Sequence, residues 1–319
     1  MDNLSITVML GMFVTLVPYI MYNFNSIRVD KNKTILWGII SFILSLLVFK
    51  ITGTIFNYIG LITTIIVATM FNLFIVKKDV DIKKIPKSIL VILLFFFISL
   101  VQLIPIYLFN LDINNLTTMQ TLLLTLFSNS ILLVILISMY RDTLKDDFKK
   151  IKNNFNEMMD IGIKCWLVGL IIMIISNVII GLFIPLANAG NEQGVQEYIS
   201  TSGIVSMLAI GIIAPIIEEL TFRKAFRDIF KSKWLFILSS GLIFGSLHVV
   251  LSLNSLWDLF YIIPYSSLGI AFGYMYYKTD NIYTSIIMHM FHNTSLTILS
   301  IIGGVMVILW WVVVKKIKC

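Results

Sequence analysis

Long apolar stretches alternate with short polar connections along most of the chain. Each stretch has about the 20 residues that an α-helix needs to cross the hydrocarbon core of a bilayer. The pattern therefore predicts an all-α, polytopic membrane helix bundle of about 10–11 transmembrane helices. The predicted spans are 4–22, 34–56, 58–76, 88–110, 121–140, 165–187, 202–222, 234–253 and 256–277.

The last apolar stretch, residues 282–314, is too long for one ordinary crossing and short for two. We expect a short or tilted helix, a break near Thr294–Ser295 or Gly303–Gly304, and a last helix that ends at Val314. Two crossings in this stretch would bring the total to eleven.

Composition supports a membrane protein. Hydrophobic residues make up 58% of the 319 residues and charged residues 13%, and the mean hydropathy is +0.95, which excludes an ordinary soluble domain. The two cysteines, Cys165 and Cys319, form neither a disulfide framework nor a metal-type spacing.

Basic residues gather in every second connection between the predicted spans. The connections 111–120, 188–201 and 254–255 contain none, and the formal net charge is +7. The positive-inside rule then places the N-terminus outside and the C-terminus in the cytoplasm. We expect the basic face to contact anionic lipid rather than nucleic acid. Basic residues occur in 23–33, 77–87, 141–164 and 223–233, at Lys278, and in 315–318.

The longest basic connection, residues 141–164, divides the chain into two parts. It mixes charged residues with apolar ones at Ile151, Phe155, Met158 and Met159, so we expect an amphipathic helix at the membrane surface. Residues 1–164 would form a five-span N-terminal region that ends in this cytoplasmic connection. Residues 165–319 contain all the candidate chemistry.

Two adjacent carboxylates, Glu218 and Glu219, lie near the end of the predicted span 202–222. Ionisable groups inside a membrane are costly and usually functional. Glu219 and Arg223 are four residues apart and can pair on one helix face, whereas Glu218 lies about 100° away. One acid is then neutralised and the other is available for chemistry. Pro215 removes a backbone hydrogen bond to Gly211 and should kink the helix there.

All three histidines, His248, His289 and His292, follow in apolar segments. Phe244 and His248 share a helix face, and the intervening Gly245 and Ser246 permit close helix approach. His289 and Asn293 share another face, with His292 beside them. Because polar groups in lipid are expected to face one another, we expect these side chains to meet Glu218.

The predicted helix boundaries place Glu218 and His248 at different depths. At 1.5 Å per residue, Glu218 would lie about 7 Å and His248 about 20 Å from the inner ends of their helices. We therefore expect that the helix 234–253 starts later, that residues 224–238 lie partly at the interface, or that helices tilt.

Two kinds of chemistry fit this set. A free carboxylate beside a histidine can act as general base on water, and His289 with Asn293 can donate two hydrogen bonds to an oxyanion. Amide hydrolysis would then need no covalent intermediate. Alternatively, Glu218 with His248 and His289 (or His292) could ligate zinc, with an open position for water. The His-Glu-x-x-His zinc helix is absent from the sequence.

The ordered motifs Glu218-Glu219-x-x-x-Arg223, Phe244-x-x-x-His248 and His289-x-x-x-Asn293 resemble the type II CAAX prenyl endopeptidase family, the CAAX proteases and bacteriocin-processing enzymes (CPBP). The resemblance covers roughly residues 205–300. It implies a helical intramembrane protease with Glu218 as base, His248 holding the water, and His289 and Asn293 forming the oxyanion hole. Glu219 and Arg223 would support the site. This scheme needs no metal or other cofactor, and His292 would support or pack.

We therefore predict a bacterial cell-membrane endopeptidase that cleaves a peptide or membrane-protein substrate near the cytoplasmic side. Bacterial relatives in this family are associated with peptide maturation, bacteriocin immunity and envelope regulation. A non-catalytic membrane scaffold that regulates a partner protein is the alternative. A transporter with Glu218 as proton carrier is the third possibility.

Overall fold

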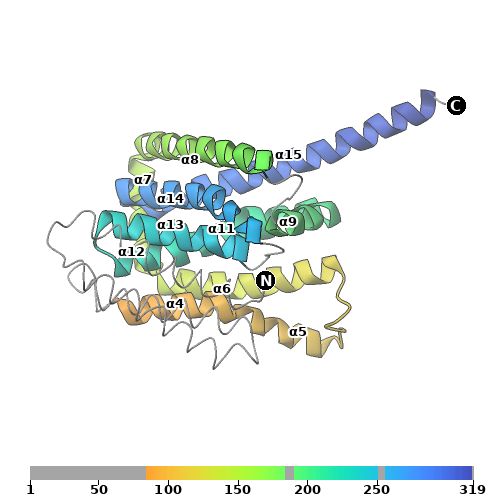
Figure 1. The fold of residues 1–319 in the computed structure, drawn as a ribbon. Coiled ribbons are helices and arrows are strands. Elements are labelled where there is room, and N and C mark those ends of the chain that lie inside the picture. The colour runs from red at the N-terminus through yellow and green to blue at the C-terminus, as the bar shows by residue number, and fades with distance from the viewer. Residues whose placement is uncertain (1–83, 184–189, 251–255, 318–319) are drawn as a thin grey trace.

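The computed structural model describes residues 84–183, 190–250 and 256–317, and all elements within these ranges are helices (Figure 1). The predicted spans 4–22, 34–56 and 58–76 lie outside the described residues. The elements are α4 (Ile85–Phe97), η2 (Ile98–Gln102), α5 (Leu103–Leu108), α6 (Thr118–Met139), α7 (Arg141–Asn153), α8 (Phe155–Phe183), α9 (Gly190–Thr201), α10 (Gly203–Ser206), η3 (Met207–Ile213), α11 (Ala214–Glu218), η4 (Glu219–Lys224), α12 (Ala225–Ile229), α13 (Lys233–Val250), η5 (Leu256–Tyr261), α14 (Ile262–Thr279) and α15 (Ile282–Ile317).

Six helical segments in the described part of the chain are long and apolar enough to cross a membrane. They confirm a multi-pass membrane protein of the predicted all-α class. The segments are Ile85–Leu108, Thr118–Met139, Phe155–Phe183, Gly203–Ile229, Lys233–Val250 and Ile282–Ile302. The predicted span 256–277 corresponds to η5 and α14, which are not among the six.

Helix α14 lies between α8 and α13 (Figure 1) and packs closely on both. Glycines make this approach possible. A Cβ atom added to Gly241 of α13 would lie 2.7 Å from the backbone nitrogen of Ile270, and one added to Gly169 of α8 would lie 2.8 Å from Ala271 Cβ. A Cβ atom at Gly245 would overlap Ser266. The predicted close approach at Gly245 is thus confirmed, and α14 is its partner.

The amphipathic connection forms a helix, but a shorter one than predicted. It is α7, and Asp147 and Ile151 are its buried residues. Phe155 and Met158 instead begin α8, and Phe155 is exposed. The backbone N–H of Ile282, in the first turn of α15, donates to Asp147 Oδ2 over 3.0 Å. Burial raises the pKa of the Asp147 carboxyl. Helix α7 therefore holds the start of α15 in place.

The expected break in residues 282–314 is wrong, because α15 runs without interruption from Ile282 to Ile317. The hydroxyl groups near the expected break are used within the helix. Thr294 Oγ1 donates to the carbonyl of Met290 over 2.6 Å, and Thr297 Oγ1 donates to the carbonyl of Asn293 over 2.9 Å. Such back-bonding is compatible with a continuous helix.

The two last spans of the predicted N-terminal region pack against the helices that carry the candidate chemistry. Phe95 of α4 and Phe222 make an edge-to-face contact with ring centroids 5.0 Å apart. Leu132 and Leu136 of α6 belong to the same buried cluster as Phe222. These N-terminal helices therefore form one wall of the bundle around the candidate site.

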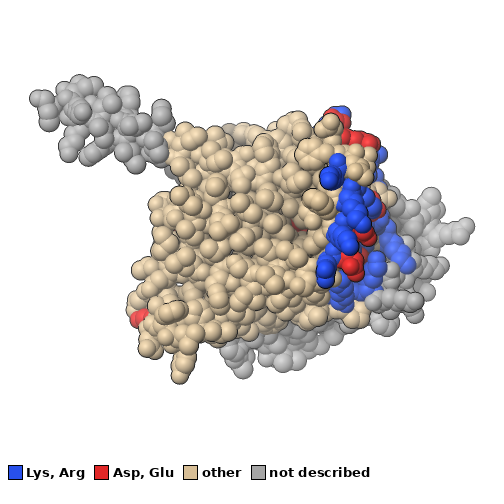
Figure 2. Space-filling model, turned by 180° about the vertical axis from the view of Figure 1, so that it is seen from behind, with Lys and Arg blue, Asp and Glu red and all other residues tan. Residues whose placement is uncertain are grey.

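Lysine and arginine side chains collect at one end of the bundle (Figure 2). This basic face includes the start of α4, helix α7, and the α12–α13 connection, and it follows the charge pattern of the sequence. Asp228 of α12 accepts from Lys224 Nζ over 2.6 Å and from Lys84 Nζ over 3.3 Å. The helices run from this face toward an opposite face on which the acids Asp112 and Glu197 are exposed.

Candidate active site

The carboxylate pair lies in one long span, Gly203–Ile229, whose helical winding changes twice. Two π-helical segments, Met207–Ile213 and Glu219–Lys224, flank the short α-helix Ala214–Glu218. Such wide turns are rare in proteins as a whole, but those that do occur are frequently found at functional sites. The span ends at Ile229 rather than at the predicted residue 222, because Lys224 and Asp228 are paired and buried instead of forming a loop.

This extension reduces the predicted mismatch in depth by about half. Glu218 now lies roughly 16 Å, and His248 roughly 22 Å, from the ends of their helices at the basic face. Of the three alternatives that we expected, a later start of the helix 234–253 is wrong, since α13 begins at Lys233. The two side chains line one cavity because the helix of Glu218 is longer than predicted.

Pro215 lies next to a carbonyl that a side chain serves, that of Ile210. The N–H of Ala214 donates to the carbonyl of Ala209, five residues earlier. If this five-residue spacing continued, the carbonyl of Ile210 would accept from the N–H of residue 215, which proline lacks. Asn293 Nδ2 donates to the Ile210 carbonyl over 3.0 Å. The Ile210 carbonyl thus accepts from a side chain, and this bond fixes Asn293 against the helix.

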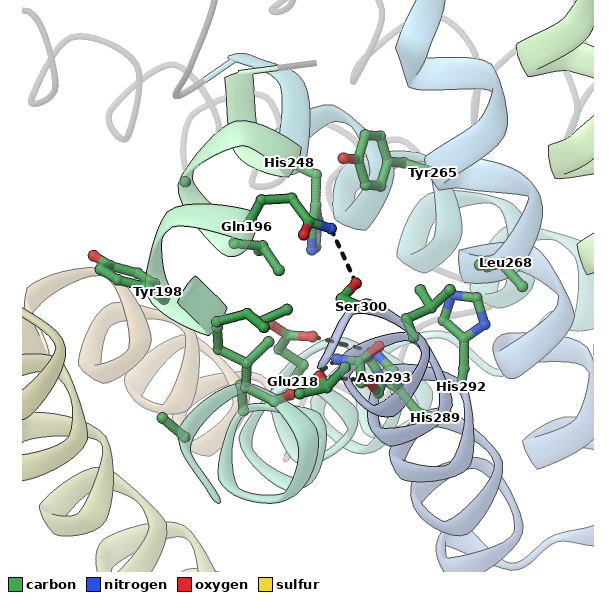
Figure 3. Close-up of a pocket in the computed structure, with 18 of the residues that line it drawn as sticks. Gln196, Tyr198, Glu218, His248, Tyr265, Leu268, His289, His292, Asn293 and Ser300 are labelled. Carbon is green, nitrogen blue, oxygen red and sulfur yellow. Dashed lines mark hydrogen bonds and ion pairs between the residues drawn. The ribbon is translucent and has the colours of Figure 1, made fainter. Parts of the chain in front are cut away.

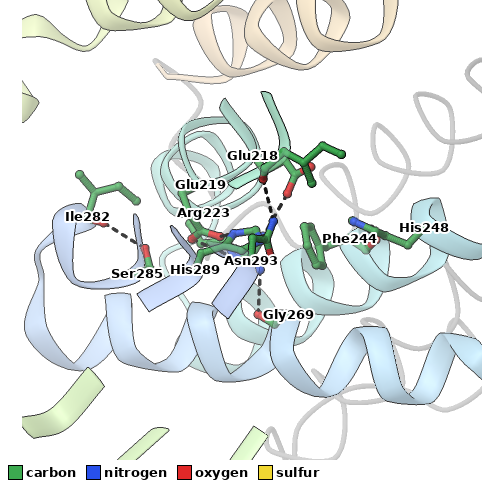
Figure 4. Close-up of polar contacts among 11 residues, drawn as sticks. Glu218, Glu219, Arg223, Phe244, His248, Gly269, Ile282, Ser285, His289 and Asn293 are labelled. Atoms are coloured by element: carbon green, nitrogen blue, oxygen red, sulfur yellow. Dashed lines mark hydrogen bonds and ion pairs between the residues drawn. The ribbon is translucent and has the colours of Figure 1, made fainter. Parts of the chain in front are cut away.

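The predicted pair of Glu219 and Arg223 is present and entirely buried. Arg223 Nε lies 3.4 Å from Glu219 Oε2, and both side chains are 0% exposed. Arg223 also donates from Nη2 to the carbonyl of Gly269 over 3.2 Å and lies 4.4 Å from the ring centroid of Phe244 (Figure 4). The pair thus ties this helix to α13 and α14.

His289 connects the two carboxylates. Its Nδ1–H donates to Glu219 Oε1 over 2.9 Å, while its Nε2 lies 3.6 Å from Glu218 Oε2 (Figure 4). The side chain of Glu218 is 17% exposed, in contrast to that of Glu219. The structure therefore separates the two acids as the spacing predicts: Glu219 is neutralised within the protein, and Glu218 faces a cavity.

His248 faces the same cavity from α13. Its Nδ1 lies 2.9 Å from the carbonyl of Phe244, which can only accept, so Nδ1 carries the proton and Nε2 is the acceptor. The ring of His248 stacks on Tyr265 of α14 with centroids 5.1 Å apart. These two contacts fix the orientation of the ring.

The cavity has a volume of about 850 Å³ (Figure 3). Glu218, His248, His289 and Asn293 all contribute to its wall, so the structure brings together the four predicted catalytic residues. Phe244 lines it as well. His292 also lines the cavity but is turned toward α8, where Trp166 Nε1 donates to its Nδ1 over 3.4 Å.

A metal site would need several side chains arranged around one point. Among the residues that the structure describes, no group of three or more His, Cys, Asp or Glu side chains could hold a metal ion. The alternative ligands Glu218, His248 and His289 line one cavity without forming such a group.

Helix α9 is a part of the cavity wall that the sequence analysis did not predict. Gln196 Nε2 donates to Ser300 Oγ of α15 over 3.3 Å, and Glu197 Oε1 accepts from Thr118 Oγ1 of α6 over 2.7 Å. The segment Gly190–Thr201 is polar and glycine-containing, so no apolar periodicity indicates a helix. Tyr265 likewise stands in an apolar stretch without a motif.

Fold and site together define a multi-pass membrane protein with a carboxylate–histidine cavity between its helices. Residues 200–295, which carry all three motifs, match the family model described as Type II CAAX prenyl endopeptidase Rce1-like. This match confirms the family resemblance predicted from the motifs. No solved structure matches the chain.

Three curated bacterial proteins are similar in sequence. "Putative membrane peptidase YdiL" of Bacillus subtilis is 27% identical over 142 residues, which cover 39% of this chain and 55% of that protein. The UPF0177 protein YbdI of Lactococcus lactis is 29% identical over 47% of this chain and 83% of that protein. The UPF0177 protein YaiF of the same organism is 36% identical over 28% of this chain and 38% of that protein. The chain thus spans about half the length of YdiL.

Proposed function

We propose that the protein is an intramembrane endopeptidase that hydrolyses peptide bonds with a water molecule activated by Glu218. The family match over residues 200–295 and the similarity to a protein named as a membrane peptidase support this activity. The observation that carries the proposal is the unequal environment of the two adjacent acids. Glu219 is 0% exposed and paired with Arg223, whereas Glu218 faces the cavity beside two histidines.

In this mechanism Glu218 takes a proton from water while the resulting hydroxide attacks the substrate carbonyl carbon. His248 accepts a hydrogen bond from that water at Nε2, since its Nδ1 is committed to Phe244. The tetrahedral intermediate carries the negative charge on the former carbonyl oxygen. When the C–N bond breaks, Glu218 returns its proton to the leaving nitrogen, so no covalent intermediate forms.

Two side chains of α15 would stabilise the oxyanion. His289 is oriented by the bond from its Nδ1–H to Glu219, which places Nε2 on the cavity side. As an imidazolium, with both ring nitrogens protonated, it donates from Nε2 to the oxyanion. Asn293 has two amide hydrogens, of which one is held by the Ile210 carbonyl and the other remains to donate. Donors fixed in this way need no reorganisation during the reaction.

The decisive variant is Glu218→Gln, which removes the base and keeps the size of the side chain. Its matched control is Glu157→Gln, since Glu157 is an exposed residue at the start of α8. We expect new protein termini in membrane proteomes of cells with wild type or the control, and none with Glu218→Gln at equal expression. Purified protein in lipid should then cleave the substrates so identified.

Identical termini in all three strains, together with a phenotype rescued equally by each, would refute the peptidase. That outcome would favour the scaffold alternative, in which the same helices bind and regulate a partner protein.

We further propose that the protein lies in the bacterial plasma membrane with its basic face in the cytoplasm, where anionic lipid neutralises the lysines. The charge asymmetry of Figure 2 supports this orientation. A role in peptide maturation, bacteriocin immunity or envelope regulation is part of this proposal and rests on the family resemblance.

A further inference from the structure

The cavity extends from Glu218 in one direction only. On the helix of Glu218 it is lined by residues that precede the acid, and on α15 by residues that follow His289. These are the directions away from the basic face, because η4 and α12 lead toward that face and α15 begins there. The lining residues on these two helices are Ala209, Ile210 and Ala214, and Asn293, Leu296, Thr297 and Ser300.

On the other helices, too, the residues that line the cavity lie away from the basic face. The lining residues of α6 lie between Leu122 and Asn129, and those of α8 between Met173 and Gly181. Both stretches lie toward the helix end that is remote from the basic connection 141–164. On α14 they begin at Pro264, again remote from Lys278. Asn177, Gly181 and Gln196, at this end of the cavity, are exposed. The cavity therefore opens at the face opposite the basic face.

The opposite end of the cavity is closed by packed side chains. Glu219 and Arg223 are 0% exposed, and Phe222 and Phe226 are 2% and 3% exposed. These residues fill the helix turns between Glu218 and the basic face. A polypeptide cannot reach Glu218 from the basic face without displacing the buried ion pair.

The lining has a distinct chemistry. Among the described residues that form it, Glu218 is the single Asp, Glu, Lys or Arg. Asn129 of α6, Asn177 of α8 and Gln196 of α9 place amide groups around the outer half (Figure 3 labels Gln196). An amide side chain offers both a donor and an acceptor, as the peptide backbone does. Apolar residues such as Leu122 and Leu296 fill the spaces between them.

We propose that the substrate is an uncharged, extended polypeptide segment that enters at the mouth beside α9, on the membrane face opposite the basic face. The amide side chains of Asn129, Asn177 and Gln196 bind its backbone. This inference rests on the proposed peptidase activity and names its substrate class. It also replaces the predicted cleavage near the cytoplasmic side with cleavage in a cavity that opens on the other face.

The entrance can be tested without any proteolysis. In full-length protein with Cys165→Ser and Cys319→Ser, single cysteines are introduced by Ser300→Cys at the mouth, Ala214→Cys one turn before Glu218, and Lys278→Cys at the basic face. A charged, membrane-impermeant maleimide is added to intact cells or to inside-out vesicles. We expect labelling at 300 and 214 from one side and at 278 from the other.

Labelling of 214 from the same side as 278 would overturn the proposed entrance, whatever the outcome of the Glu218→Gln experiment. Blocked labelling at 214 from both sides, with 300 labelled, would also overturn it, because the cavity would not be continuous. These results are separate from a failure of the peptidase proposal, which would leave the labelling pattern intact.

The substrate class is tested on a cleaved reporter once one is in hand. A single Lys or Asp within the segment next to the scissile bond should lower cleavage at least tenfold, because the described lining offers no Asp, Glu, Lys or Arg as counter-charge apart from Glu218, which serves as the base. Gln196→Leu should raise KM about three- to tenfold with little change in kcat. Gln193→Leu, on the same helix but outside the lining, is the control. Equal cleavage of charged and neutral reporters would overturn the substrate class.

Discussion

Replacing Arg223 with methionine keeps most of its volume but leaves the Glu219 carboxylate without its cation. Both side chains are 0% exposed, so no water can compensate for the lost charge. Removing one partner of a buried ion pair costs about 3–5 kcal/mol. His289 still donates to Glu219 over 2.9 Å, so we expect the lower end, about 3 kcal/mol. The ratio of folded to unfolded protein should then fall roughly a hundredfold.

The measurement is the unfolding midpoint of purified protein in mild detergent, followed by size-exclusion chromatography after a temperature series. Arg141→Met is the matched control, because Arg141 is exposed at the start of α7. The double variant Glu219→Gln/Arg223→Met removes both charges and should be more stable than Arg223→Met alone, since no unpaired charge remains. A midpoint for Arg223→Met equal to that of Arg141→Met would refute the reasoning. So would a double variant no more stable than Arg223→Met.

Three further predictions concern other parts of the fold. Asn293→Ala should lower kcat about 10²–10³-fold with a smaller effect on KM, because it removes an oxyanion donor; unchanged turnover in a peptide assay would contradict that role. Asp147→Ala should lower the free energy of unfolding by about 1–2 kcal/mol, because the first turn of α15 loses its cap. The unfolding midpoint should fall accordingly, whereas exposed Asp146→Ala should leave it unchanged. Gly245→Val should lower the yield of monodisperse protein, because its side chain would overlap α14; a wild-type yield would show that the helices can separate there.

Hydropathy alone located most of the described spans. The predicted 121–140 and 234–253 correspond to Thr118–Met139 and Lys233–Val250, because a bilayer dictates the length of an apolar helix whatever its neighbours. The residue at which a helix ends was harder to predict where charged residues are present. Lys224 resembles a residue of a basic loop, yet its bond of 2.6 Å to Asp228 lets the helix continue to Ile229.

The residues of the candidate site could be predicted from the sequence, but the π-helical winding of the helix that carries Glu218 could not. Glu218 and His289 are polar residues in apolar helices, and the cost of isolating them in lipid indicates that they meet. Nothing in the pattern of apolar positions indicates a π-helical turn. The hydrogen bond from Asn293 Nδ2 to the carbonyl of Ile210 depends on that turn, so it could be found only in the structure.

Helix α14 has a consequence for how the protein is made. It is absent from the helices that are apolar enough to cross a membrane by themselves, and small residues such as Gly269 and Gly273 leave much of its backbone dependent on neighbours for cover. A nascent α14 released alone into lipid would be poorly retained. We therefore expect α14 to enter the membrane together with α13, its predecessor in the chain and its packing partner. Assembly of the cavity also needs α15, which follows α14 in the chain, so the carboxylates and histidines meet only after both helices have been inserted.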